Sequence, residues 1–130
     1  MRQTFSKDER LGSHRLISRL FAEGSTIHLK PFRGTWMHAS FDGPSPVQVL
    51  MGVPKYNFKK AVHRNMIRRR MKEAYRLNKH LLYDSLNAKR QQLVLSITYT
   101  AKEILPFDLI QGKIILLLQR LTEENEKVTG

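Results

Sequence analysis

Positively charged side chains are concentrated in one short stretch of the chain, between Lys55 and Arg76. This stretch holds nine Lys or Arg and a single acid, Glu73, so it carries a net charge of +8 out of +12 for the whole protein. Guanidinium groups can bind a phosphate through two hydrogen bonds and can also stack on bases. The residue types therefore indicate recognition of a polyanion, and nucleic acid is the first partner expected.

The spacing of these residues predicts a helix that carries the charge on one side. The segment from Ala61 to Leu82 contains neither Gly nor Pro and is expected to be the longest helix. One arc of this helix gathers Arg64, Asn65, Arg68, Arg69, Lys72 and Arg76. The opposite arc gathers the apolar residues Ile67, Met71, Ala74 and Tyr75, which can pack on a sheet. Like charges four residues apart destabilise an isolated helix by a few tenths of a kcal/mol per pair, and a bound polyanion would remove that penalty.

Three further cations precede the predicted helix: Lys55, Lys59 and Lys60. They are expected to extend the same surface. Because each neutralised phosphate releases counterions, binding should weaken steeply as the salt concentration rises.

The composition narrows the class of protein. The chain has 130 residues, of which 41% are hydrophobic, and this fits one folded domain. No apolar stretch approaches the roughly 18 residues needed to span a bilayer, and the start lacks the apolar run of a signal peptide. A cytoplasmic protein without a membrane partner is therefore expected. The absence of cysteine excludes disulfides and thiolate chemistry, and the five His show no metal-ligand spacing, so no metal site is expected on the chain.

The elements before the charged stretch are predicted from periodicity and turn residues. Apolar residues between Lys7 and Glu23 recur at helical spacing, with Ser13 as a candidate N-cap and Gly24 as a stop. The segment 25–41 favours one irregular strand. A turn over 42–46 is expected to join it to an antiparallel strand over 47–53.

After the charged stretch, a buried strand is predicted over 92–98 and a final helix over 107–121, followed by a frayed polar tail over 122–130. Together these elements predict a single α+β domain, with one layer of mixed sheet packed against helices.

The segment from Lys59 to Arg76 also carries a specific pattern. The string Ala61-Val62-His63-Arg64-Asn65-Met66-Ile67-Arg68-Arg69 resembles the signature of the bacterial ribonuclease P protein component family. The flanking residues agree in order and spacing: Phe5-Ser6-Lys7 and Arg10-Leu11 at the start, Ile17 and Phe21 before Gly24, and Val53-Pro54-Lys55 ahead of the motif. The resemblance covers about residues 5–121.

The resemblance implies the protein subunit of ribonuclease P, an endoribonuclease that removes the 5′ leader of precursor tRNA. In such an enzyme the catalytic RNA subunit holds the active site and its Mg²⁺ ions, and this chain would supply no catalytic residue and need no obligate protein partner. The implied order of elements is α-β-β-β-α-β-α, similar to the second domain of a ribosomal small-subunit protein, with a left-handed β-α-β crossover.

Site residues follow from the same resemblance. By position, Arg64, Asn65, Arg68, Arg69 and Lys72 would contact RNA, beside the cations already assigned from charge. Four residues are candidates for a cleft that receives the single-stranded leader, namely Ile17, Phe21, Phe32 and Trp36. Two positions depart from the family pattern. Met66 stands where an Arg is frequent, with Arg70 nearby to replace its charge, and Ile17 stands where an aromatic residue is common, which leaves only apolar contact.

Three other functions compete with this one. A structural RNA-binding protein of ribosomal type would share the charge and the fold, and only the Arg-Asn motif separates the two. A DNA-binding repressor would require two short helices joined by a tight turn, whereas a strand and a proline precede the basic helix. A self-contained metal-dependent nuclease would require clustered carboxylates, and the charged stretch offers only Glu73.

Overall fold

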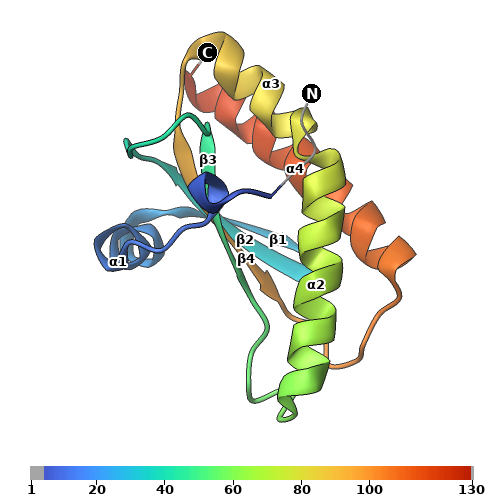
Figure 1. The fold of residues 1–130 in the computed structure, drawn as a ribbon. Coiled ribbons are helices and arrows are strands. Elements are labelled where there is room, and N and C mark those ends of the chain that lie inside the picture. Colours follow the sequence, from blue (N-terminus) through green and yellow to red (C-terminus); the bar gives the residue numbers. More distant parts are fainter. Residues whose placement is uncertain (1–4, 130) are drawn as a thin grey trace.

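A four-stranded sheet lies in the middle of the protein and separates helices on its two sides (Figure 1). The structure is a computed structural model and describes residues 5–129. The strands are β1 (Ser25–Leu29), β2 (Phe32–His38), β3 (Val47–Gly52) and β4 (Leu93–Tyr99). Their order across the sheet is β1-β2-β4-β3, and β4 is antiparallel to β2 but parallel to β3. The mixed α+β fold is as expected.

The helices divide between the two faces of the sheet. They are the 3-10 helix η1 (Lys7–Glu9), α1 (His14–Glu23), α2 (Ala61–Asn78), α3 (His80–Lys89) and α4 (Phe107–Thr129). Helices α2, α3 and α4 cover one face, whereas α1 packs near one end of the other (Figure 1). Much of that second face is therefore left without a helix.

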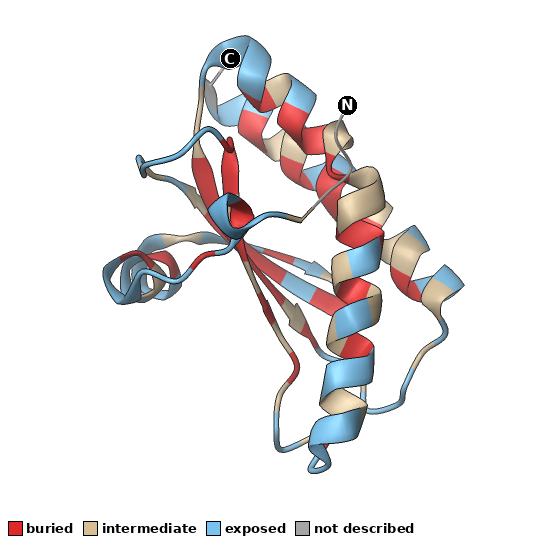
Figure 2. Ribbon diagram, in the orientation of Figure 1, coloured by how far each residue is buried: buried red, intermediate tan, exposed pale blue. Residues whose placement is uncertain are grey.

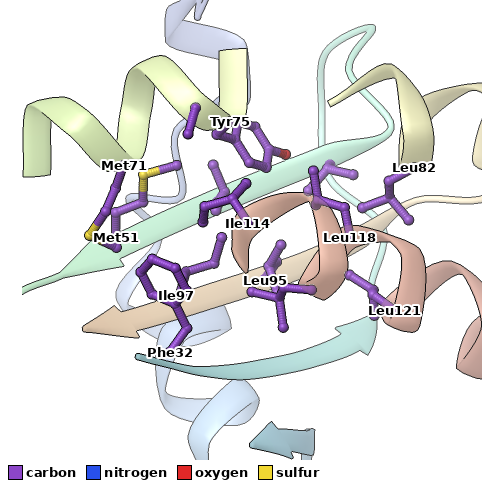
Figure 3. Close-up of a cluster of buried hydrophobic side chains, with 14 of the residues drawn as sticks. Phe32, Met51, Met71, Tyr75, Leu82, Leu95, Ile97, Ile114, Leu118 and Leu121 are labelled. Atoms are coloured by element: carbon purple, nitrogen blue, oxygen red, sulfur yellow. The ribbon is translucent and has the colours of Figure 1, made fainter. Parts of the chain in front are cut away.

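Alternation along the strands decides which side chains meet which helices. In β4, Leu95 and Ile97 join the large core beneath α2 and α4, whereas Val94 points the other way and packs with Leu16 and Leu20 of α1. The large core brings side chains from the sheet together with Met71, Tyr75, Leu82, Ile114, Leu118 and Leu121 of the three helices (Figure 3). Each large apolar side chain that is fully buried stabilises a fold by about 1.5–3 kcal/mol. Together these side chains fix α2 against the sheet.

The ends of α1 confirm the predicted cap and stop. Ser13 Oγ accepts a hydrogen bond from the backbone N–H of Leu16 at 3.3 Å. Gly24 follows the last helical residue, and a Cβ there would lie 2.5 Å from the Leu20 carbonyl oxygen. Before Ser13 the chain is not part of α1: after η1 it runs along β3, where the Leu11 N–H donates to the Val49 carbonyl at 3.0 Å.

The segment 25–41 forms two strands, so the single irregular strand predicted from its residues is wrong. Strands β1 and β2 pair as an antiparallel hairpin around Lys30 and Pro31, with Leu29 opposite Phe32. Strands β2 and β3 run antiparallel, as expected of the turn between them, but β4 lies between them in the sheet. The parallel pair β3 and β4 is joined through α2 and α3, which is the crossover that the resemblance implies; its left hand stays a prediction.

The helix predicted over 61–82 is divided at Lys79 into α2 and α3. Its sequence contains no Gly or Pro that would mark the break. The side-chain amide of Asn78 donates to the Ala74 carbonyl at 2.8 Å, and the Leu82 N–H bonds only three residues back, to Lys79, at 3.0 Å. Lys79 itself is drawn into the protein, where it is 4% exposed.

The last helix continues well beyond residue 121, so the prediction of a frayed tail from Thr122 is wrong. Asn125 is fully buried, and its Oδ1 lies 2.6 Å from His38 Nε2 while its amide donates to Gln91 Oε1 at 3.1 Å. These contacts hold the end of α4 against β2 and the segment before β4, and the polar sequence gave no sign of them.

Candidate nucleic-acid interface

Helix α2 presents its predicted apolar arc to the core and its cationic arc outward. Ile67, Met71, Ala74 and Tyr75 are all fully buried, as expected. We call the residues of the other arc the cationic strip: Arg64, Asn65, Arg68, Arg69, Lys72 and Arg76, each of them partly or fully exposed. Lys55, Lys59 and Lys60 are exposed in the loop just ahead of α2 (Figure 2). Packing of the apolar arc thus holds the strip at the surface.

The charge of α2 is largely uncompensated by acids. Within residues 5–129, Arg76 is the one cation between Lys55 and Arg76 that pairs with a carboxylate, at 2.6 Å from Glu73. The hydrogen bond from Arg76 lowers the pKa of Glu73. The remaining cations of this stretch keep an unneutralised charge, which is the electrostatic condition for attracting phosphates.

Two arginines of α2 bind backbone carbonyls, where they also stabilise loops. Arg64 donates to the Phe58 and Lys59 carbonyls at 2.7 and 2.9 Å, and so holds the loop before the helix. Arg70 donates to the Leu105 carbonyl at 2.7 Å on the side of α4. Arg68 instead donates one exposed hydrogen bond, to Asn65 Oδ1 at 3.1 Å, and its guanidinium remains available to a ligand.

A small notch adjoins the strip where α2 passes the edge strand β3. It has a volume of about 140 Å³ and is lined by side chains that include Arg10, Leu50, Met51, Arg68 and Lys72. Partial burial lowers the pKa of Lys72, and the nearby charges of Arg10 and Arg68 lower it further. Three cations therefore converge here. Arg10 was absent from the predicted site, because only its pairing beside Val49 brings it to α2.

Beyond β3, the sheet face opposite α4 continues the surface formed by the cationic strip and the notch. Its residues form rows across the strands, in one of which Gly52, Thr98, Arg33 and His28 are successive neighbours. Arg33 and His28 are exposed. Sequence analysis missed both, although alternation in β2 would have placed them on this face once the hairpin register was known.

The four leader-cleft candidates lie in different surroundings. Phe21 of α1 is 54% exposed and Ile17 is half-buried, so both can be reached from solvent. Phe32 and Trp36 are only 1% and 4% exposed, and β2 directs them into the core beneath α4. Their assignment to an exposed cleft is therefore wrong. Phe32 packs edge-on against Tyr99 instead, with ring centroids 5.9 Å apart.

The described residues include neither a group of metal ligands nor a membrane-spanning helix. In that part of the chain, no three His, Asp or Glu side chains lie together in a group that could hold a metal ion. None of its helices has the length and apolar character needed to cross a membrane.

The fold and the site define a class: a small α+β protein with one largely open sheet face and a long helix whose cations are mostly unpaired. The family model described as Ribonuclease P matches residues 5–122. The ribonuclease P protein component of Porphyromonas gingivalis is 33% identical over 106 residues, which are 82% of this chain and 77% of that protein. The chain belongs to the ribonuclease P protein component family.

Solved structures agree on the fold. The RNase P protein from Thermotoga maritima superposes with a TM-score of 0.68 at 22% identity and covers 86% of this chain and 96% of that one. The Staphylococcus aureus RNase P protein gives a TM-score of 0.69 at 15% identity, over 87% of this chain and 94% of that one.

Proposed function

We propose that this chain acts as the protein subunit of ribonuclease P, which binds the catalytic RNA subunit and the 5′ leader of precursor tRNA and thereby promotes 5′-end maturation. Family membership supports the assignment to ribonuclease P, and the cationic strip supports an RNA-binding role for this subunit. The single observation that carries the RNA-binding role is that the cations of α2 before Arg76 lack carboxylate partners within residues 5–129, although they crowd one helix.

The division of labour follows from the residue types at this surface. Arg68, Arg69 and Lys72 can engage phosphates, which orients an RNA strand but breaks no bond. The exposed Phe21 of α1 offers an apolar contact to a single strand, and Thr98 offers a hydroxyl group in the row of the open sheet face that contains Arg33. Base stacking on an exposed aromatic is worth about 1–3 kcal/mol per base. In this proposal the reaction takes place in the RNA subunit.

The assignment to ribonuclease P also implies a cofactor, Mg²⁺, and a location, the cytoplasm. Mg²⁺ would be held by the RNA of the assembled enzyme, where it can polarise the reacting phosphate, and we assign no ligand for it on this chain. An enzyme that matures tRNA in a bacterium is expected in the cytoplasm.

The proposal is tested by reconstitution with the ribonuclease P RNA of the same genome. Cleavage of precursor tRNA would be measured with and without the protein at several salt and Mg²⁺ concentrations. We expect the protein to strengthen binding of substrates that carry a leader more than binding of mature tRNA, with an affinity that falls steeply as salt increases. Equal affinity for both tRNAs would contradict leader binding. Cleavage by the pure protein without RNA would overturn the division of labour.

A further inference from the structure

A buried ion pair lies beside the cationic strip and joins two segments that are 70 residues apart in the sequence. Lys79 Nζ, at the junction of α2 and α3, lies 2.9 and 2.7 Å from the two carboxylate oxygens of Glu9 in η1. Tyr83 donates a hydrogen bond to the same carboxylate at 2.7 Å. Glu9 and Lys79 are only 5% and 4% exposed. We call Glu9, Lys79 and Tyr83 the clamp.

Further contacts fix the carboxylate of Glu9 in this position. The backbone N–H and the hydroxyl of Ser6 donate to its Oε1 at 3.1 and 3.2 Å. Tyr75 and Tyr83 hydroxyls are 3.0 Å apart, which ties the carboxylate to the buried face of α2. An ion pair with this many hydrogen bonds holds η1 in one orientation, because breaking it would leave a buried charge without a partner.

The residue after Glu9 is Arg10, and the clamp determines where its side chain goes. Glu9 points into the protein, while Arg10 forms a parallel bridge with Val49 and lines the notch with Arg68 and Lys72. Arg10 is the extended residue that directly follows η1, so the anchoring of Glu9, which fixes η1, also fixes where the chain places Arg10. The anchoring has an electrostatic effect as well. Because the Glu9 carboxylate is paired with Lys79, this neighbouring acid is not available to neutralise Arg10.

We propose that the notch between Arg10, Arg68 and Lys72 binds one phosphate of the RNA, and that the clamp residues are positioning residues that hold Arg10 in it. The inference rests on the proposed RNA-binding function and extends it to the N-terminal segment. The notch has a volume of about 140 Å³, which leaves room for a phosphate group. The apolar residues Leu50 and Met51 on its wall exclude water from one side, which strengthens a charge-assisted contact.

The test measures the affinity of the full chain, assembled with its RNA subunit, for precursor tRNA with a single-stranded leader. Arg10→Gln is expected to weaken binding at least about tenfold and to reduce the slope of log affinity against log salt by about one. Lys7→Gln is the matched control, since it removes the same charge from an exposed position of η1, and it should leave the affinity near that of the wild type.

The clamp is tested by a double-mutant cycle. In the background Glu9→Leu/Lys79→Met, which replaces the ion pair with apolar side chains and should retain the fold, Arg10→Gln is expected to have less than about a threefold effect. Tyr83→Phe keeps the ring and removes one hydrogen bond to Glu9, so it should reduce the contribution of Arg10 partway even if the double replacement does not fold.

The outcomes separate the inference from the function on which it rests. If Arg68→Gln weakens binding and Arg10→Gln does not, the notch assignment is wrong while the RNA-binding function stands. If Arg10→Gln has the same effect with the clamp intact and with the clamp altered, Arg10 binds RNA but the clamp does not position it. If neither arginine matters, the proposed function fails too.

Discussion

The two parts of α2 use the same kind of residue in opposite ways. Up to Lys72, its cations have no carboxylate partner in the described chain, and they face outward or bind loop carbonyls. From Glu73 onward, Arg76 pairs with Glu73 at 2.6 Å, and Lys79, which follows the helix, pairs with Glu9 at 2.7 Å. The difference shows that a cation's role depends on its partner as well as on its charge. The first part is suited to a ligand, whereas the buried pair of Lys79, just after the second part, stabilises the fold.

The strongest test of this contrast is removal of Lys79. Lys79→Met leaves the Glu9 carboxylate buried without its cation, so the free energy of unfolding should fall by about 3–5 kcal/mol. Urea denaturation followed by circular dichroism measures this change. Adding Glu9→Leu removes the stranded charge and should restore most of the lost stability. If the single variant is as stable as the wild type, the ion pair has no structural role.

Arg68→Ala is expected to have the opposite effect to Lys79→Met: it should weaken RNA binding and leave stability nearly unchanged. Its loss should weaken RNA binding by about 1–3 kcal/mol, because a charge-assisted phosphate contact disappears. Its stability should change little, since its side chain contacts Asn65 on the helix surface. Binding to the RNA subunit and to precursor tRNA at several salt concentrations provides the measurement. An affinity equal to that of the wild type throughout would remove Arg68 from the interface.

The pH dependence of stability should report on the clamp. Burial by itself would raise the pKa of Glu9, but hydrogen bonds from Lys79, Tyr83 and Ser6 outweigh it and lower the pKa below the ordinary value of 4.5. A carboxyl whose pKa is lower in the folded state stabilises the protein above its unfolded pKa, and this contribution is lost as pH falls through the folded pKa. The wild type should therefore lose more stability on acidification than Glu9→Leu/Lys79→Met, as measured by urea midpoints at neutral and acid pH. Parallel pH profiles would contradict the prediction.

Arg76→Gln is expected to have the smallest effect. Arg76 was predicted to contact RNA, but its guanidinium is engaged with the exposed Glu73, and exposed ion pairs contribute little to stability. Thermal unfolding should be unchanged within error, and RNA affinity should fall less than in Arg68→Ala. A loss of affinity equal to that of Arg68→Ala would show that RNA displaces Glu73 and that the two parts of α2 act together.

Local sequence was sufficient to predict the features that depend on near neighbours. The caps at Ser13 and Gly24 and the two arcs of α2 follow from spacing along one helix, so they could be predicted without knowledge of the rest of the fold. The motif around Arg64 and Asn65 was likewise enough to indicate the family. Which residues of the strip contact RNA stays a prediction.

Tertiary structure alone decided the features that depend on distant partners. Residue types do not reveal that Glu9 meets Lys79, that β4 lies between β2 and β3, or that Asn125 is buried. Phe32 and Trp36 were misplaced for the same reason, because strand alternation defines two faces but only packing against α4 selects the buried one. Periodicity is a local property of the chain, whereas the choice of face and of ionic partner is set by contacts that form only when the chain folds.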